Sequence, residues 1–130
     1  MPSYSTRSKA KLETCHPLLQ EVFKEVIKHF DHTIICGHRN QEAQDEAFRA
    51  GFSKKRYPEG RHNSQPSLAV DALPYPIDWQ DRERHVLFAG YVLGVAETLG
   101  VSLRWGGDWD SDYETSDTTF WDAAHFELVI

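Results

Sequence analysis

Residues 60–71 read Gly-Arg-His-Asn-Ser-Gln-Pro-Ser-Leu-Ala-Val-Asp, and residues 121–128 read Trp-Asp-Ala-Ala-His-Phe-Glu-Leu. Together the two stretches supply two imidazoles, His62 and His125, and one carboxylate, Asp71. Two nitrogen ligands and one oxygen ligand suit a four-coordinate zinc ion and leave its fourth position open. An open position is typical of catalytic metal sites, so the pattern indicates hydrolytic chemistry.

Composition and charge narrow the class of protein. The chain has 130 residues, 40% of them hydrophobic, which suits one domain over residues 1–130 with a single core. No apolar run approaches the about 18 residues that a membrane-spanning helix needs, so no membrane insertion is expected. The formal net charge of −6 argues against nucleic acid as a partner. The basic run Lys54-Lys-Arg56 with Arg61 is either a solvated loop or, alternatively, a landing site for an anionic polymer.

The cysteines and the N-terminal segment indicate no special chemistry. Cys15 and Cys36 lack the close spacing of a Cys-x-x-Cys motif, so we expect free thiols and no disulfide. Basic residues near the start are followed by Leu12-Glu-Thr-Cys15 and not by an apolar stretch, so no secretory signal is expected. Residues 1–14 are polar and predict a loose arm or a short turn.

Periodic apolar residues and capping residues predict three helices. Apolar side chains recur at three- and four-residue steps over residues 17–30. Asn40 as N-cap and Gly51 as C-terminal stop delimit a helix over about 41–50. Asp81 caps a third helix that runs to about Leu99.

Short β-rich runs predict four strands, over residues 33–36, 68–73, 101–104 and 125–130. Residues 51–66 and 108–119 lack periodicity and predict loops, the second of them acidic. The order is helix, strand, helix, strand, helix, strand, strand. It predicts an α+β domain with a small, mainly antiparallel sheet flanked by helices.

The segment from Ile35 to Gln44, with Gly51 beyond it, reads as a strand that leads into a helix and carries Arg39. With His62…Asp71 and Asp122-x-x-His125, it makes the chain resemble the zinc D-alanyl-D-alanine carboxypeptidases and the phage L-alanyl-D-glutamate endopeptidases. These enzymes share the hedgehog-type zinc peptidase fold. The resemblance spans about residues 17–130, and it implies one zinc ion bound by the two histidines and Asp71.

The resemblance also implies roles for residues around the metal. Asp122 would be the general base and acid, and Arg39 would stabilise an oxyanion or hold a substrate carboxylate. Gln44 would lie about one turn into the following helix, where it contacts substrate or only orients Arg39. Glu127 faces the same side of its strand as His125, so it is either a competing base or an acceptor that orients that imidazole.

Each metal residue has a simpler alternative when it is taken alone. His62 lies in a polar loop and could be an exposed surface histidine, and His125 could be a satisfied core imidazole. Asp71 lies in an apolar run, where burial is costly unless it binds a metal or pairs, for example with Arg39. Their joint occurrence favours the metal site.

The segment Arg104-Trp-Gly-Gly-Asp-Trp109 carries two tryptophans at a glycine turn. Trp105 and Trp109 either line a groove for sugars or peptides or anchor the core. The alternation Asp108-x-Asp110-x-Asp112 is similar to a calcium loop but lacks the glycine and the final glutamate of an EF-hand. We therefore expect no calcium there.

The resemblance predicts a zinc metallopeptidase that cleaves peptidoglycan stem peptides, as a phage endolysin acting on the L-alanyl-D-glutamate bond. Such a protein is expected to be a monomer, made in the host cytoplasm and released to the cell wall with the help of a holin. Three alternatives stay open: a D-alanyl-D-alanine carboxypeptidase, a zinc-containing binding module without catalysis, and a virion-associated protein.

Overall fold

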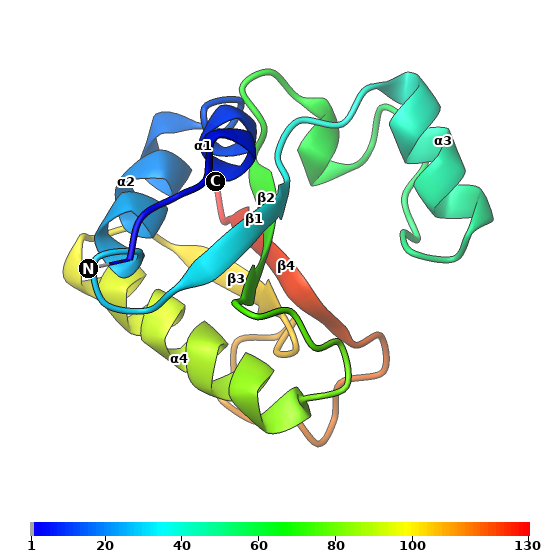
Figure 1. The fold of residues 1–130 in the computed structure, drawn as a ribbon. Coiled ribbons are helices and arrows are strands. Elements are labelled where there is room, and N and C mark those ends of the chain that lie inside the picture. Colours follow the sequence, from blue (N-terminus) through cyan, green and yellow to red (C-terminus); the bar gives the residue numbers. More distant parts are fainter. Residues whose placement is uncertain (1) are drawn as a thin grey trace.

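A four-stranded antiparallel sheet organises the chain in the computed structural model, which describes residues 2–130 (Figure 1). The elements in chain order are α1 (Thr6–Leu12), α2 (Pro17–Val26), β1 (His32–Cys36), α3 (Gln41–Arg49), the 3-10 turn η1 (Arg61–Asn63), β2 (Ala69–Pro74), α4 (Arg82–Thr98), β3 (Leu103–Gly106) and β4 (Asp122–Leu128). The predicted α+β class with an antiparallel sheet is confirmed.

The strand order is β1-β2-β4-β3, so β2 and β4 occupy the centre of the sheet. Their register pairs Asp71 with His125, and the pairing of β1 with β2 sets Cys36 opposite Asp71. Side chains alternate between the two faces of a strand. Val70 and Ala72 therefore enter the core, while Asp71 points to the other face.

The main core lies between the sheet and the helices α1, α2 and α4, which gather on one side of it in Figure 1. Phe126 packs edge-on against Phe23 of α2 and Phe88 of α4, with ring centroids 5.6 and 6.1 Å apart. Edge-to-face aromatic pairs stabilise such a core beyond the area that they bury. Helix α3 stands away from this layer, beyond the end of β1. The opposite face of β2 and β4 is left for the functional residues.

The prediction of a loose arm over residues 1–14 is wrong, because residues 6–12 form α1 and pack on β1. Ser5 caps the helix, and Leu12 is buried in the core. The Ser8 hydroxyl accepts a hydrogen bond from the Ile34 amide at 3.1 Å. The seven residues of α1 are mostly polar, so they show no apolar periodicity from which a helix could be predicted. The tertiary contact with β1 stabilises this short helix.

Several boundaries also differ from the predictions. Helix α2 ends at Val26, although the Phe30 ring beyond it still packs on the core. Strand β3 begins two residues later than predicted, at Leu103, and β4 begins three residues earlier, at Asp122. The pairing of Gly106 with Asp122 extends both strands toward the acidic loop. Apolar content alone did not predict this register.

Two further expectations concern the cysteines and the membrane. Cys15 and Cys36 are both free thiols, as expected. Among residues 2–130, no helix combines the length and the apolar character needed to cross a bilayer.

Candidate metal centre and groove

His62, Asp71 and His125 come from η1, β2 and β4 and meet on the open face of the sheet. Each residue offers one potential ligand atom, and the three atoms lie within 4.8 Å of one another. Oδ1 of Asp71 is 3.2 Å from Nε2 of His62 and 3.4 Å from Nδ1 of His125. The structure therefore brings together the three residues that the sequence proposed as a metal site.

Both imidazoles are oriented by a second partner. Nδ1 of His62 lies 2.7 Å from the carbonyl oxygen of Gly37, which can only accept a hydrogen bond. Nε2 of His125 lies 2.8 Å from Oε1 of Glu127. Each ring thus donates outward through one nitrogen and turns the other toward Asp71, as metal-binding histidines do. The donor set of two imidazoles and a carboxylate fits a metal ion.

The charge of Asp71 dominates the electrostatics of this group. Burial lowers the pKa of His62, but the charge of Asp71 and a hydrogen bond to it raise the pKa to about 10. Burial also lowers the pKa of His125, which hydrogen bonds to Asp71 and Glu127 raise to about 9. Burial would raise the pKa of Asp71, but the charge of His62 and hydrogen bonds from both imidazoles hold it well below its usual range. A buried, ionised carboxylate of this kind attracts positive charge.

Asp122 begins β4 and lines the groove that opens over the metal group. Burial and the nearby charge of Asp71 raise the pKa of Asp122 to about 6. A carboxylate that titrates near neutrality is suited to accept and return a proton. Its backbone lies so close to β3 that a Cβ at Gly106 would be 2.1 Å from the Asp122 carbonyl oxygen. Only glycine fits at this position.

Arg39 follows β1 and lies beside the metal group. Its Nη2 is 3.4 Å from Oδ2 of Asp71, and its Nη1 donates to Oε1 of Gln44 at 3.0 Å. The salt bridge to Asp71, which the sequence left open as an alternative, is therefore present. Arg39 also lines the groove.

Gln44 is fully buried, and its amide is engaged by protein. Oε1 also accepts from Nδ2 of Asn63 at 3.2 Å, and Nε2 donates to the hydroxyl of Ser53 and the carbonyl of Lys55. The arrangement fits the orienting role rather than substrate contact. Asn63 was missed in the sequence, where only its position next to His62 could have indicated it.

Glu127 uses both carboxylate oxygens within the protein. Oε1 accepts from His125, and Oε2 lies 3.6 Å from Nε of Arg61 and 3.5 Å from Nη1 of Arg104. Burial would raise the pKa of Glu127, but the hydrogen bond from His125 and the charges of His125, Arg61 and Arg104 lower it. A low pKa and occupied oxygens fit an acceptor that orients His125, and they make Glu127 a poor base.

Trp105 and Trp109 differ in their surroundings, because one is buried in the core and the other lines the groove. Trp105 is 3% exposed, donates from Nε1 to the Ala123 carbonyl and packs edge-on against Trp121. It anchors the core, so of the two alternatives the structure supports the core anchor and not the substrate-binding residue. Trp109 lines the groove, with its ring centroid 5.4 Å from that of His125.

The acidic loop brings Asp108, Asp110 and Asp112 together, each with an oxygen within 4.8 Å of the others. Asp108 is buried and accepts hydrogen bonds from the amides of Asp112 and Tyr113. These bonds organise the loop.

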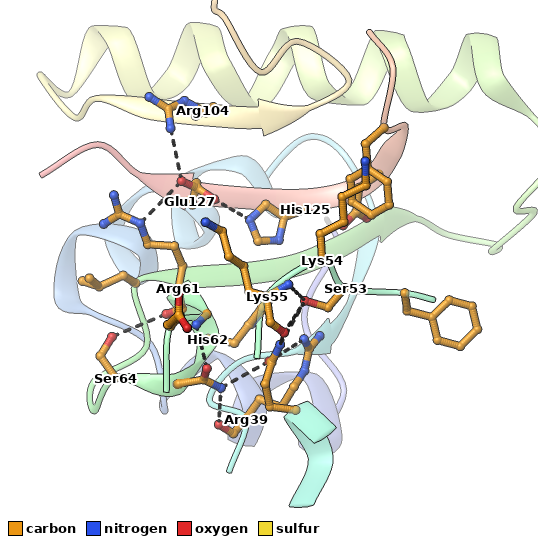
Figure 2. Close-up of a pocket in the computed structure, with 18 of the residues that line it drawn as sticks. Arg39, Ser53, Lys54, Lys55, Arg61, His62, Ser64, Arg104, His125 and Glu127 are labelled. Carbon is orange, nitrogen blue, oxygen red and sulfur yellow. Dashed lines mark hydrogen bonds and ion pairs between the residues drawn. The ribbon is translucent and has the colours of Figure 1, made fainter. Parts of the chain in front are cut away.

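A groove of about 980 Å³ opens over the metal group (Figure 2). Its walls come from the loop after α3, from η1 and from strands β3 and β4. The volume is large enough for a peptide segment. An open groove, a His-Asp-His group and an adjacent acid with a raised pKa make this a candidate hydrolytic metal centre.

Comparisons with known proteins agree with this class. The family model for the phage L-alanyl-D-glutamate peptidase matches residues 2–129. The chain is 30% identical over 136 residues to the L-alanyl-D-glutamate peptidase of Escherichia phage T5, and the match covers 97% of each chain. The crystal structure of the Serratia marcescens L-Ala D-Glu endopeptidase ChiX is similar with a TM-score of 0.76 and 26% identity, over 97% of this chain and 89% of that one. The chain therefore belongs to the phage L-alanyl-D-glutamate peptidase family, which confirms the resemblance found in the sequence.

Proposed function

We propose that this chain is a zinc-dependent endopeptidase that hydrolyses the L-alanyl-D-glutamate bond in peptidoglycan stem peptides. The observation that carries the proposal is the meeting of His62, Asp71 and His125 beside Asp122 in an open groove. Membership of the phage peptidase family supports the reaction and the substrate.

Zinc is the metal that the ligand set favours, because two imidazoles and one carboxylate are typical of catalytic zinc sites. His62 would bind through Nε2 and His125 through Nδ1, the nitrogens that face Asp71. When bound, the ion polarises the scissile carbonyl and lowers the pKa of water at the site.

Asp122 accepts the proton of the attacking water and passes it to the leaving amine. Its pKa of about 6 leaves it ionised at neutral pH and still able to carry the proton between the two steps. Asp122 lines the same groove as His125, and it forms no ion pair among residues 2–130.

Arg39 stabilises negative charge as it develops on the carbonyl oxygen. Its side chain is 15% exposed, and Gln44 holds one of its nitrogens, so the guanidinium is positioned before substrate arrives. Fixed positive charge of this kind is usually a large contribution to catalysis. Trp109 packs beside His125 and offers an aromatic wall to the substrate.

The cell wall would be the only macromolecular partner that this activity needs. We propose that the protein acts as a monomer after its release from the phage-infected cell, with the help of a holin.

The test is mass spectrometry of purified peptidoglycan incubated with the zinc-loaded protein and with an EDTA-treated control. Metal-dependent appearance of a new D-glutamate amino terminus is expected. Loss of terminal D-alanine alone would identify a carboxypeptidase instead. Absence of any cleavage by protein that binds zinc stoichiometrically would identify a binding module, and the same protein in purified virions would place it in the particle.

A further inference from the structure

The groove is positively charged in a protein whose formal net charge is −6. Among the described residues that line it, five are lysine or arginine and three are aspartate or glutamate. Two of these acids, Asp122 and Glu127, already serve the metal site, and a bound divalent ion would add further positive charge. The excess of positive charge suits a ligand that is itself negative.

Four of the five cationic side chains already have a partner. Arg39 is held by Gln44 and Asp71, and Lys54 lies 4.7 Å from the centroid of the Phe120 ring. Arg61 and Arg104 share one oxygen of Glu127 at 3.6 and 3.5 Å, distances too long for strong hydrogen bonds. These two guanidiniums therefore keep most of their donor capacity for a ligand.

Among the described residues that line the groove, Lys55 is the one cation whose charged group has no side-chain partner. It makes no ion pair with any carboxylate of residues 2–130. Its side chain extends across the cavity in Figure 2, in the direction of His125. Lys55 is an exposed residue of the loop after α3, and its side chain lines the groove.

The backbone of Lys55 is held in place by two side chains, those of the buried Gln44 and of the half-buried Ser53. Its carbonyl accepts a hydrogen bond from Nε2 of Gln44 at 2.6 Å, and its amide donates to the Ser53 hydroxyl at 3.1 Å. Gln44 is fully buried and also holds Arg39, so one amide sets the positions of both cations relative to the metal group. These hydrogen bonds fix the point from which the Lys55 side chain enters the groove.

The chemistry of the proposed substrate supplies a matching anion. In a stem peptide, D-glutamate continues the chain through its γ-carboxyl group, so its α-carboxylate is free. That carboxylate stands on the carbon that carries the scissile nitrogen, and it must lie within the groove when the bond is cleaved. Amidation converts it to D-isoglutamine, which has no charge.

We propose that Lys55, with Arg61 and Arg104 in the same groove, binds the free α-carboxylate of the D-glutamate residue and makes the enzyme selective for acidic over amidated stem peptides. The inference rests on the proposed function, because it assumes that the groove holds a stem peptide. Lys55 is the specificity-determining residue. Arg61 and Arg104 contribute charge while they also support Glu127.

The test measures kcat/KM on two synthetic stem peptides that differ only in having D-glutamate or D-isoglutamine after L-alanine. Wild-type enzyme should prefer the acid by about tenfold to a hundredfold, the effect of one hydrogen bond to a charged group. Lys55→Met should lose that preference by slowing cleavage of the acid alone, and Lys55→Arg should keep most of it. Lys24→Met removes an equal charge from the exposed face of α2 and should leave kcat/KM on both peptides unchanged.

Equal wild-type rates on the two peptides would overturn the inference, and so would an equal loss on both peptides in Lys55→Met. Either result leaves the endopeptidase itself intact. A zinc-loaded wild type that cleaves neither peptide refutes the proposed function, and the subsite with it.

Discussion

Replacing Glu127 by glutamine tests how the metal site is supported. Oε1 of Glu127 accepts the proton of His125 Nε2 at 2.8 Å, while Oε2 faces Arg61 and Arg104. A glutamine has the same shape but one of its two terminal atoms is a donor. In either orientation of the amide, this NH₂ group faces another donor, the imidazole or the two guanidiniums.

The expected magnitude follows from these contacts. A hydrogen bond to a charged acceptor is worth about 1.5–3 kcal/mol, which corresponds to about tenfold to a hundredfold in an equilibrium constant. Loss of a partner that orients a metal-binding histidine typically has an effect of about the same size on metal affinity. Glu127→Gln should therefore weaken zinc binding by about this factor and lower activity chiefly at limiting zinc.

The assay is zinc titration in competition with a chromophoric chelator, combined with activity at saturating zinc. Glu59→Gln is the matched control, because Glu59 also lines the groove but is exposed and makes no ion pair among residues 2–130. Unchanged zinc affinity in folded Glu127→Gln would refute the orienting role. If activity were lost at full zinc occupancy, Glu127 and not Asp122 would be the base.

Three further predictions concern the base, the buried amide and the metal-free protein. Asp122→Asn should keep stoichiometric zinc but lower kcat by about 10²–10⁴, the usual contribution of a general base, as measured on purified cell walls; an unchanged kcat removes Asp122 from the mechanism. Gln44→Leu should destabilise the fold by about 2–3 kcal/mol in urea denaturation, because Arg39 and other donors lose a buried acceptor; a variant as stable as wild type contradicts the role assigned to this amide. In the EDTA-treated protein, folding raises the pKa of His62 to about 10 and of His125 to about 9 from 6.5, so their stabilisation is complete below about pH 6.5 and is lost as the pH rises through 9 to 10. Thermal unfolding of the metal-free protein between pH 6 and 10 should show this loss, and a flat profile would argue against the Asp71 interaction.

Much of the architecture could be predicted from local sequence signals. The helices α2, α3 and α4 follow from apolar periodicity and from caps such as Asn40 and Asp81, which accept hydrogen bonds from the first turn as expected. These signals act between residues close in the chain, so they need no knowledge of the fold. Helix α1 has a capping serine but no apolar periodicity, and its stability depends on contact with β1.

The sequence by itself determined which residue types were available: two imidazoles, an acid in an apolar strand and a further acid near the second imidazole. It also indicated the family, through the resemblance carried by His62, Asp71, Asp122 and His125. It left open whether Glu127 is a base or an orienting acceptor, and whether Trp105 faces a groove or the core.

Only the tertiary structure decided those questions. Strand register pairs Asp71 with His125, and the fold brings Arg61 and Arg104 from separate elements to one oxygen of Glu127. The burial of Gln44, which links Arg39 to Lys55, likewise depends on how α3 packs against the loop that follows it. The physical reason is that a side chain's role depends on partners distant in the chain, and those distances are set by register and packing.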